Sequence, residues 1–186
     1  MHPFSPGGKT RAMRSAETPE AAVLVRPATE DELDLLVEQT WSVAAEGRFI
    51  GAEVPFDRAR RRARLGELLG AETSTVLVAD TCAAGGPGVV GHLTVSVAPY
   101  GVADIGMLLQ AGWRGRGIGR ALLDAAIAWA TSAGAHKMSL EVWPDNAAAI
   151  ALYERAGFVV EGRKAKHYRR RNDELWDSIL MGRPLP

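Results

Sequence analysis

The chain has 186 residues, of which 47% are hydrophobic and 24% are charged. Lysine and arginine (22) equal aspartate and glutamate (22), so the formal net charge is zero. A nucleic-acid-binding domain usually carries a basic excess, so this balance argues against nucleic acid as a partner. The single cysteine, Cys82, excludes an internal disulfide and fits a reducing compartment.

The first 21 residues differ in composition from the rest of the chain. They contain proline, glycine and scattered charge without an apolar stretch, so they do not form a signal peptide. Nowhere does the sequence approach the roughly 18 apolar residues of a membrane span. We therefore expect a flexible leader at 1–21, one domain at 22–186, no membrane partner, and a cytoplasmic monomer or homodimer.

Hydrophobic periodicity and turn residues predict the secondary structure. In chain order we expect a strand near residue 24, helices at 31–45 and within 56–70, strands at 74–80, 89–98 and 102–109, a helix from about 117 to 133, a strand at 136–143, a helix within 144–157, and a closing hairpin with its turn near Asn172 and Asp173. Thr29 and Glu32 have capping-box spacing, Asp57 is placed as an N-cap, and Gly157 as a helix C′ residue. This order predicts a mixed sheet with helices on its faces.

The most informative stretch is AGWRGRGIGRALL, residues 111–123, in which glycines and arginines run into an apolar helix. N–H groups at a helix start are unpaired and lie at the positive end of the helix dipole, so the stretch predicts a phosphate site. A Walker A loop is excluded because Ile118 and Gly119 occupy its Lys-Ser/Thr positions. A dinucleotide fingerprint is excluded because Arg120 or Leu122 stands at its third position. A ligand-free turn accounts for the glycines but not for the arginines.

Two motifs together resemble the GNAT superfamily of acyl-CoA-dependent N-acyltransferases. RGRGIG, residues 114–119, is similar to the family's (Q/R)-x-x-G-x-(G/A) loop, which cradles the pyrophosphate of coenzyme A. NAAAIALYERAGF, residues 146–158, is similar to the family's N-x-x-A-x-x-L-Y-x-x-x-G-F. The resemblance extends over about residues 23–183. Many relatives have arginine where this chain has Ala148, so any cofactor contact from that side chain is lost.

The resemblance implies a GNAT fold of the α/β (α+β) class, with a mixed, mostly antiparallel central sheet of about six to seven strands flanked by four helices. It implies acetyl-CoA as co-substrate and no metal. The residues it assigns to cofactor binding are Met107, Leu108, Leu109, Arg114, Gly115, Arg116, Gly117, Ile118, Gly119, Arg120 and Asn146. For Asn146, helix capping is a competing role.

Glu141 and Tyr153 are the predicted catalytic residues. Deprotonating a lysine-like amine with a pKa near 10.4 at pH 7 costs roughly 4–5 kcal/mol, so a general base is useful. Glu141 lies on the polar face of its strand, and its LEV context resembles ribosomal-protein alanine acetyltransferases, in which this glutamate is the base. Asp104, water, or a surface role for Glu141 are the alternatives. Tyr153 matches the family tyrosine that protonates the leaving thiolate, with ring packing as the alternative.

The acceptor amine is the least defined part of the prediction. Three carboxylates and two phenylalanines in the 46–57 linker suit an ammonium group, namely Glu46, Glu53, Asp57, Phe49 and Phe56. Six basic residues in the 163–171 hairpin suit a carboxylate or a phosphate, unless the hairpin is a solvated ribbon. The linker and the ending ELWDSILM resemble amino-acid and phosphinothricin-type acetyltransferases. We predict an N-acetyltransferase of a small amine or amino acid. A protein or peptide N-terminal acetyltransferase and a non-catalytic acyl-CoA sensor are the alternatives.

Overall fold

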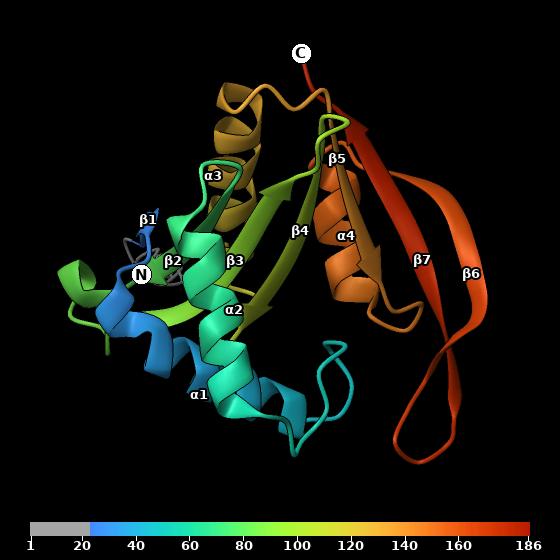
Figure 1. Ribbon diagram of the computed structural model, residues 1–186, viewed down its shortest axis with the longest axis horizontal. Coiled ribbons are helices and arrows are strands. Elements are labelled where there is room, and N and C mark those ends of the chain that lie inside the picture. Colours follow the sequence, from blue (N-terminus) through green and yellow to red (C-terminus); the bar gives the residue numbers. More distant parts are fainter. Residues whose placement is uncertain (1–22) are drawn as a thin grey trace, which may run out of the picture.

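The computed structural model describes residues 23–186, so the leader expected at 1–21 lies outside the described residues. The main elements are β1 (Leu24–Pro27), α1 (Leu33–Ala45), α2 (Arg58–Gly70), β2 (Ser74–Asp80), β3 (Val89–Val97), β4 (Val102–Leu109), α3 (Ile118–Ser132), β5 (Lys137–Val142), α4 (Ala147–Arg155), β6 (Val159–Arg169) and β7 (Leu175–Pro184). Their order agrees with the order expected from the sequence (Figure 1). None of the helices in 23–186 is long and apolar enough to cross a bilayer.

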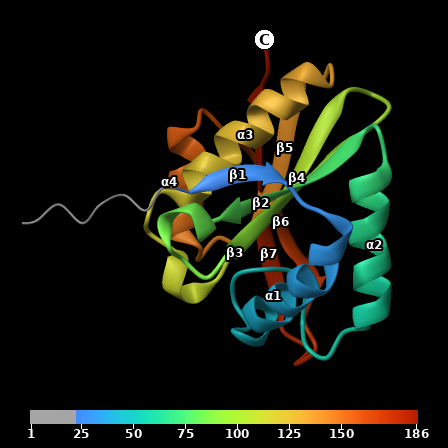
Figure 2. The ribbon, with the colours of Figure 1, turned by 90° about the vertical axis from the view of Figure 1, so that its left-hand side faces the viewer.

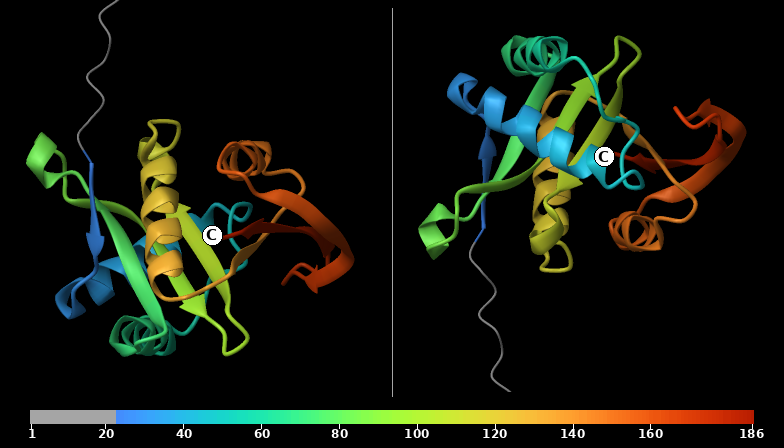
Figure 3. Two further views of the ribbon diagram at one scale, coloured as in Figure 1. Left: turned by 90° about the horizontal axis from the view of Figure 1, so that it is seen from above. Right: turned by 90° about the horizontal axis from the view of Figure 1, so that it is seen from below.

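The strands form one seven-stranded sheet in the order β1-β2-β3-β4-β5-β7-β6. Within the described part of the chain, β4 and β5 are the one parallel pair and the remaining neighbours are antiparallel. Helices α1 and α2 cover one face of the sheet, and α3 and α4 cover the other (Figures 2 and 3). The predicted fold class, a mostly antiparallel sheet flanked by four helices, is confirmed.

Two apolar clusters hold these layers together. The larger one lies between the sheet and the α3–α4 side and includes the fully buried Leu122, Met138 and Phe158. The smaller one lies under α1 and α2 and includes Leu36 and Leu65. Because side chains alternate along a strand, β2 contributes Leu77 to the larger cluster and Val76 and Val78 to the smaller one, whereas β3 presents polar residues beside the smaller cluster.

The sheet splits at its centre, and the split determines where a ligand can enter. β4 and β5 pair from Val102 with Lys137 to Asp104 with Ser139, and their pairing ends there. Beyond this point β4 continues along β3 while β5 continues along β7, so the two strands diverge (Figure 1). Residues 105–109 of β4 therefore have backbone groups on the side of the split that are not paired with β5.

Helix ends follow the predicted capping. The Thr29 N–H donates to the Glu32 carboxylate at 2.9 Å, which is one half of the predicted capping box, although a short 3-10 turn precedes α1. Asp57 caps α2 by accepting from the Arg60 N–H at 2.9 Å. Gly157 follows α4 with φ of +85°, a conformation that glycine adopts without the steric cost of a side chain.

Candidate active site

A cavity of about 860 Å³ opens where β4 and β5 diverge. Its walls come from β4, the glycine-rich loop before α3, the end of β5, α4, and the linker between α1 and α2. Of the residues predicted to bind the cofactor, those on its wall are Met107, Leu108, Leu109, Arg114, Gly115, Gly117, Gly119, Arg120 and Asn146. Both predicted catalytic residues, Glu141 and Tyr153, also line it. Residues from four separate elements are thus brought to one site.

The glycine-rich loop places a helix start at this cavity. Gly115 and Gly117 have φ of +73° and +79°, which favours glycine at both positions, and Gly117 is the N-cap of α3. The N–H groups of Arg120 and Ala121 are the first to bond within the helix, both to the Gly117 carbonyl. The N–H groups just before them belong to the set that a helix start leaves available for an anion.

Two residues of the predicted cofactor set do not line the cavity. The Ile118 side chain is 2% exposed and packs in the core beneath α3, so only its backbone belongs to the helix start. The Arg116 guanidinium lies over the Trp113 ring, 4.9 Å from its centroid. Gly119 has a packing reason for lacking a side chain, because an added Cβ would approach Leu152 to 3.1 Å.

The loop arginines are partly neutralised by neighbouring carboxylates. Arg114 forms two hydrogen bonds with Glu46, at 2.7 and 2.5 Å, and its guanidinium lies 4.2 Å from the centroid of Phe49. Arg120 is paired with Asp124 at 2.8 Å. The Arg114 contact occupies Glu46, which we had expected to face an ammonium-bearing acceptor. It also attaches the α1–α2 linker to the glycine-rich loop.

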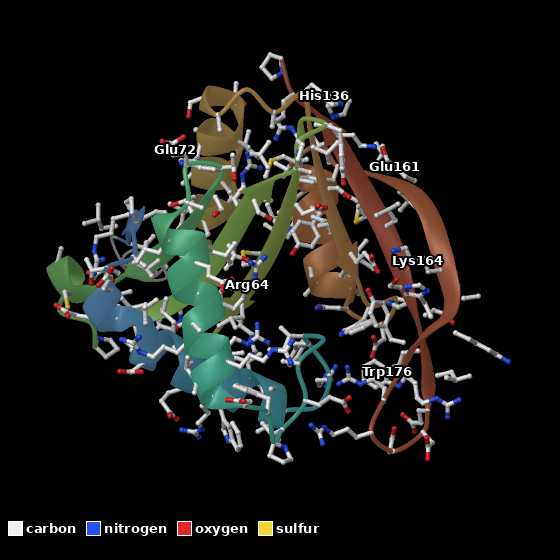
Figure 4. The ribbon with its side chains drawn as sticks, viewed as in Figure 1. Arg64, Glu72, His136, Glu161, Lys164 and Trp176 are labelled. Atoms are coloured by element: carbon white, nitrogen blue, oxygen red, sulfur yellow. The ribbon has the colours of Figure 1, made fainter. Side chains whose placement is uncertain are left out.

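Glu141 accepts hydrogen bonds from three side chains. Tyr168 Oη and Ser178 Oγ donate to Oε2 at 2.8 and 2.7 Å, and Lys164 Nζ donates to Oε1 (Lys164 is labelled in Figure 4). Burial alone would raise the pKa of Glu141, but the three donors outweigh it and hold the pKa below its ordinary value. Glu141 is therefore a charged group at neutral pH.

Of the residues around Glu141, the sequence indicated Lys164 only as one of the six basic residues of the hairpin, and it did not indicate Tyr168. These two residues are four residues apart on β6, a spacing that places both on one face of a regular strand. Which face that is depends on the register with β7, and this register shifts twice along β6. The even spacing of Lys164 and Tyr168 could indicate that the two side chains share a face, but it did not specify Glu141 as their hydrogen-bond partner.

Asp104 is the second carboxylate on this side of the sheet. It is exposed on β4, at the last paired position before the split, opposite Ser139. Desolvation by the surrounding strands and the negative charge of Glu141 raise the pKa of Asp104, with a smaller opposing effect of Lys164. Of the two carboxylates, Asp104 is therefore the stronger proton acceptor, whereas the negative charge of Glu141 is stabilised by its three hydrogen-bond donors.

Tyr153 is held by the C-terminal turn of α4. The N–H of Gly157 donates to the Glu154 carbonyl at 2.9 Å, and the N–H of Phe158 donates to the Tyr153 carbonyl at 3.0 Å, which is a Schellman motif. Burial raises the pKa of Tyr153 to about 12, so its hydroxyl stays protonated at neutral pH. The side chain is 7% exposed and borders the cavity, which makes it available as a proton donor.

Asn146 caps the other end of α4. Its side-chain oxygen accepts from the Ala149 N–H at 3.3 Å, so the competing capping role is present. Asn146 also borders the cavity, together with Ala148 and Ala149. The two roles considered for Asn146 are thus compatible in position.

The β6–β7 hairpin closes the site from the side of the linker. Arg170 is 6% exposed, lies 3.4 Å from Glu53 and donates to the Gly51 carbonyl at 3.2 Å. Its guanidinium also lies 4.4 Å from the centroid of Trp176 (Figure 4). Glu53 is therefore engaged by the hairpin, and Asp57 by its helix cap, so neither linker carboxylate is positioned as a free ammonium site.

Several basic residues of the hairpin are paired within the protein. Arg163 pairs with Asp177 at 2.5 Å and Arg169 with Asp173 at 3.0 Å. The Arg171 guanidinium donates to the Pro55 carbonyl at 2.6 Å. Arg163 and Arg169 thus pair within the hairpin, and Arg171 attaches the hairpin to the linker, so part of the positive charge of the hairpin is balanced by the protein itself.

Comparison with known proteins identifies the family. The two sequence motifs that carry the resemblance, the glycine-rich loop and the segment from Asn146 to Phe158, both contribute residues to the cavity at the split. Residues 48–158 match the acetyltransferase (GNAT) family, which is more than half of the chain. The chain belongs to this family.

Individual relatives agree with this assignment. The chain is 37% identical over 100 residues to the L-amino acid N-acetyltransferase AaaT of Escherichia coli K12, covering 51% of this chain and 61% of that protein. It is 41% identical over 70 residues to the [ribosomal protein bS18]-alanine N-acetyltransferase of the same organism, covering 38% and 47%. The matched region thus spans about half to three fifths of these curated relatives.

A solved structure shows the same fold. A phosphinothricin acetyltransferase from Sinorhizobium meliloti, in complex with AcCoA, superimposes with a TM-score of 0.77 at 23% identity, covering 88% of each chain.

Proposed function

We propose that the protein is an acetyl-CoA-dependent N-acetyltransferase that acts on the primary amine of a small molecule or amino acid. The observation that carries the proposal is the cavity at the β4–β5 split, which has a glycine-rich helix start at one part of its wall and Glu141 and Tyr153 at another. Binding of AcCoA by the Sinorhizobium meliloti protein, and the amino-acid acetyltransferase name of the Escherichia coli relative, support the same co-substrate and acceptor class.

The residues at the cavity fit the chemical groups of acetyl-CoA. The helix start of α3, with Gly115 and Gly117 in left-handed conformations, suits a pyrophosphate, because it offers N–H groups at the positive end of a helix dipole. Residues 107–109 of β4 border the cavity where the strand lacks a β5 partner, which suits hydrogen bonds to an extended amide-containing arm. Asn146 lies on the opposite wall.

In the proposed reaction the acceptor amine attacks the thioester carbonyl directly, through a tetrahedral intermediate. The new C–N bond forms, the C–S bond breaks, the amine loses a proton to the enzyme or to water, and the thiolate takes up a proton. We assign the second proton transfer to the Tyr153 hydroxyl, which borders the cavity and is protonated at neutral pH before the reaction begins.

For the first proton transfer, we keep Glu141 as the proposed base and Asp104 as its rival. Glu141 remains charged and hydrogen-bonded, so it attracts and orients an ammonium group and accepts its proton directly or through water. The low pKa of Glu141 makes it a weak proton acceptor, whereas the raised pKa of Asp104 favours that residue. The two assignments differ in the pH profiles that they predict.

Acetyl-CoA turnover, followed as thiol release, tests the proposal across a panel of amino acids, polyamines, aminoglycosides and short peptides. We expect turnover concentrated in the amino acids or small amines, together with an increase in thermal stability on adding acetyl-CoA. Turnover of peptides alone would instead establish a peptide N-terminal acetyltransferase. Stabilisation by acetyl-CoA without turnover of any acceptor would favour the acyl-CoA sensor, and absence of both effects would reject the proposal.

A further inference from the structure

A second cavity, of about 360 Å³, lies on the α1–α2 side of the sheet. It shares Ile50, Gly51 and residues 105–108 with the larger cavity, so the two meet at β4. Ligand cavities in proteins usually measure roughly 300–1,000 Å³, so this one suits a small molecule. Gly106 is among the residues that border both cavities.

The wall of this smaller cavity includes Arg61, a partly buried arginine with no anionic partner in the described part of the chain. Three other arginines of α2 are paired, Arg58 with Glu38, Arg62 with Asp34, and Arg64 with Glu67. For Arg61, none of the carboxylates in residues 23–186 lies within ion-pairing distance, and burial lowers its pKa. Desolvating a cation without a counter-ion is unfavourable, so an anion that binds beside Arg61 removes that penalty.

The surroundings of Arg61 also suit a polar ligand. His92, Thr94 and Ser96 of β3 line the same cavity, with His92 at 5% exposure. Burial, and to a smaller extent the charge of Arg61, lower the pKa of His92 to about 4, so His92 is neutral at pH 7. The Arg61 guanidinium lies 5.5 Å from the centroid of Phe56, which limits the directions in which it can move.

Negatively charged side chains lie nearer the split between β4 and β5. Asp104 also lines the smaller cavity, and Glu141 lines the larger one. A cationic wall at Arg61 and carboxylates near the split match a molecule that carries both an ammonium group and a carboxylate. Arg64 lies at the rim of the same cavity, on the side of α2 that faces β4 (Figure 4).

We propose that the smaller cavity binds the carboxylate of the amine acceptor through Arg61, so that the enzyme selects free amino acids over amines that lack an acid group. The inference rests on the proposed amine acetylation and names its substrate class. It separates free amino acids from peptide N-termini, because a peptide has an amide where the free amino acid has its α-carboxylate.

Binding measurements test this assignment without requiring turnover. Calorimetric titration of the protein saturated with coenzyme A would compare free L-amino acids, such as methionine, phenylalanine and lysine, with their methylamides. The variants are Arg61→Met, Arg61→Lys and the control Arg60→Met, which alters an exposed arginine of the same helix that does not line the cavity. Thermal unfolding of each variant checks that it is folded.

We expect at least one free acid of the panel to bind the wild-type protein tenfold or more tightly than its methylamide. Arg61→Met should weaken binding of the free acid tenfold or more without changing the affinity for the methylamide. Arg61→Lys should weaken binding of the acid by a smaller factor, since lysine keeps the positive charge but lacks the planar guanidinium group. Equal binding of acid and amide, equal loss for both in Arg61→Met, or no binding of any free acid would overturn the inference.

A parallel turnover assay separates this inference from the proposed function. If carboxylate binding depends on Arg61 but no acetyl transfer occurs, the carboxylate site is supported and the proposed acetyltransferase function is rejected. Turnover of amides or polyamines as fast as free acids would retain the acetylation and reject the role of Arg61.

Discussion

The rings of Tyr153 and Phe158 pack with their centroids 5.8 Å apart, while the Phe158 N–H donates to the Tyr153 carbonyl. The last turn of α4 and the three residues that connect it to β6 thus form one unit, in which Gly157 supplies the left-handed turn and Phe158 packs against the tyrosine ring. This gives a physical reason for the L-Y-x-x-x-G-F spacing. The motif fixes the position of a tyrosine that borders the cavity.

Tyr153→Phe should lower kcat by about 10²-fold, since it removes the proton donor for the thiolate while retaining the ring packing. The KM for acetyl-CoA should change less than twofold, as measured by thiol release. Tyr100→Phe is the matched control, because Tyr100 is 71% exposed and does not line the cavity. Unchanged kcat in Tyr153→Phe would show that the tyrosine serves packing only.

Glu141→Gln should reduce turnover at pH 7 by about 10²-fold and shift the pH–rate profile towards alkaline pH, where the amine loses its proton in solution. Glu161→Gln is a close control, because Glu161 also pairs with a lysine, at 2.7 Å, and has the same 29% side-chain exposure outside the cavity. An unmoved profile in Glu141→Gln, with a shifted profile in Asp104→Asn, would transfer the base role to Asp104.

Gly117→Ala should weaken acetyl-CoA binding several-fold and lower the free energy of unfolding by roughly 1–2 kcal/mol, because alanine disfavours its φ of +79°. Gly134→Ala provides the comparison, since Gly134 has the same φ at the other end of α3 and does not line the cavity. We expect a similar loss of stability there, by denaturant unfolding, without a change in acetyl-CoA affinity. Equal loss of affinity in both variants would refute a specific role of the loop.

The stability of the protein should fall as the pH decreases from about 7 to 5, because of His92. Its pKa in the folded protein is about 4, below the ordinary 6.5, so in this range the unfolded chain binds more protons and unfolding becomes easier. The effect should reach roughly 2 kcal/mol at pH 5. Denaturant unfolding of wild type and His92→Gln would measure it, and identical pH slopes for the two proteins would contradict the attribution.

Local features of this protein could be predicted well from its sequence. The element order, the Asp57 cap, the Gly157 turn and the helix start at Gly117 all involve residues within a few positions of one another. Their physical causes are side-chain periodicity, backbone sterics and short-range hydrogen bonds, which a stretch of ten or so residues already contains. Two such local motifs were sufficient to indicate the family.

Charge pairing was not predictable in the same way. Glu46 and Glu53 stood in the sequence as candidates for an ammonium site, yet they pair with Arg114 and Arg170 across 68 and 117 residues respectively. Which basic residue reaches which carboxylate depends on how the linker and the hairpin dock. The sequence therefore indicated which charged residues are present in the linker and the hairpin, but not which of them form ion pairs.

The sequence by itself determined the order of helices and strands, the glycine-rich start of α3, and the position of a tyrosine near the end of α4. Only the tertiary structure decided that β4 and β5 part after Asp104 and Ser139, and that Lys164, Tyr168 and Ser178 surround Glu141. It also decided that Arg61 pairs with none of the carboxylates within residues 23–186. The physical reason is the separation along the chain over which each interaction acts. Backbone preferences act between neighbours in the chain, whereas sheet register and desolvation depend on residues that meet only in the folded protein.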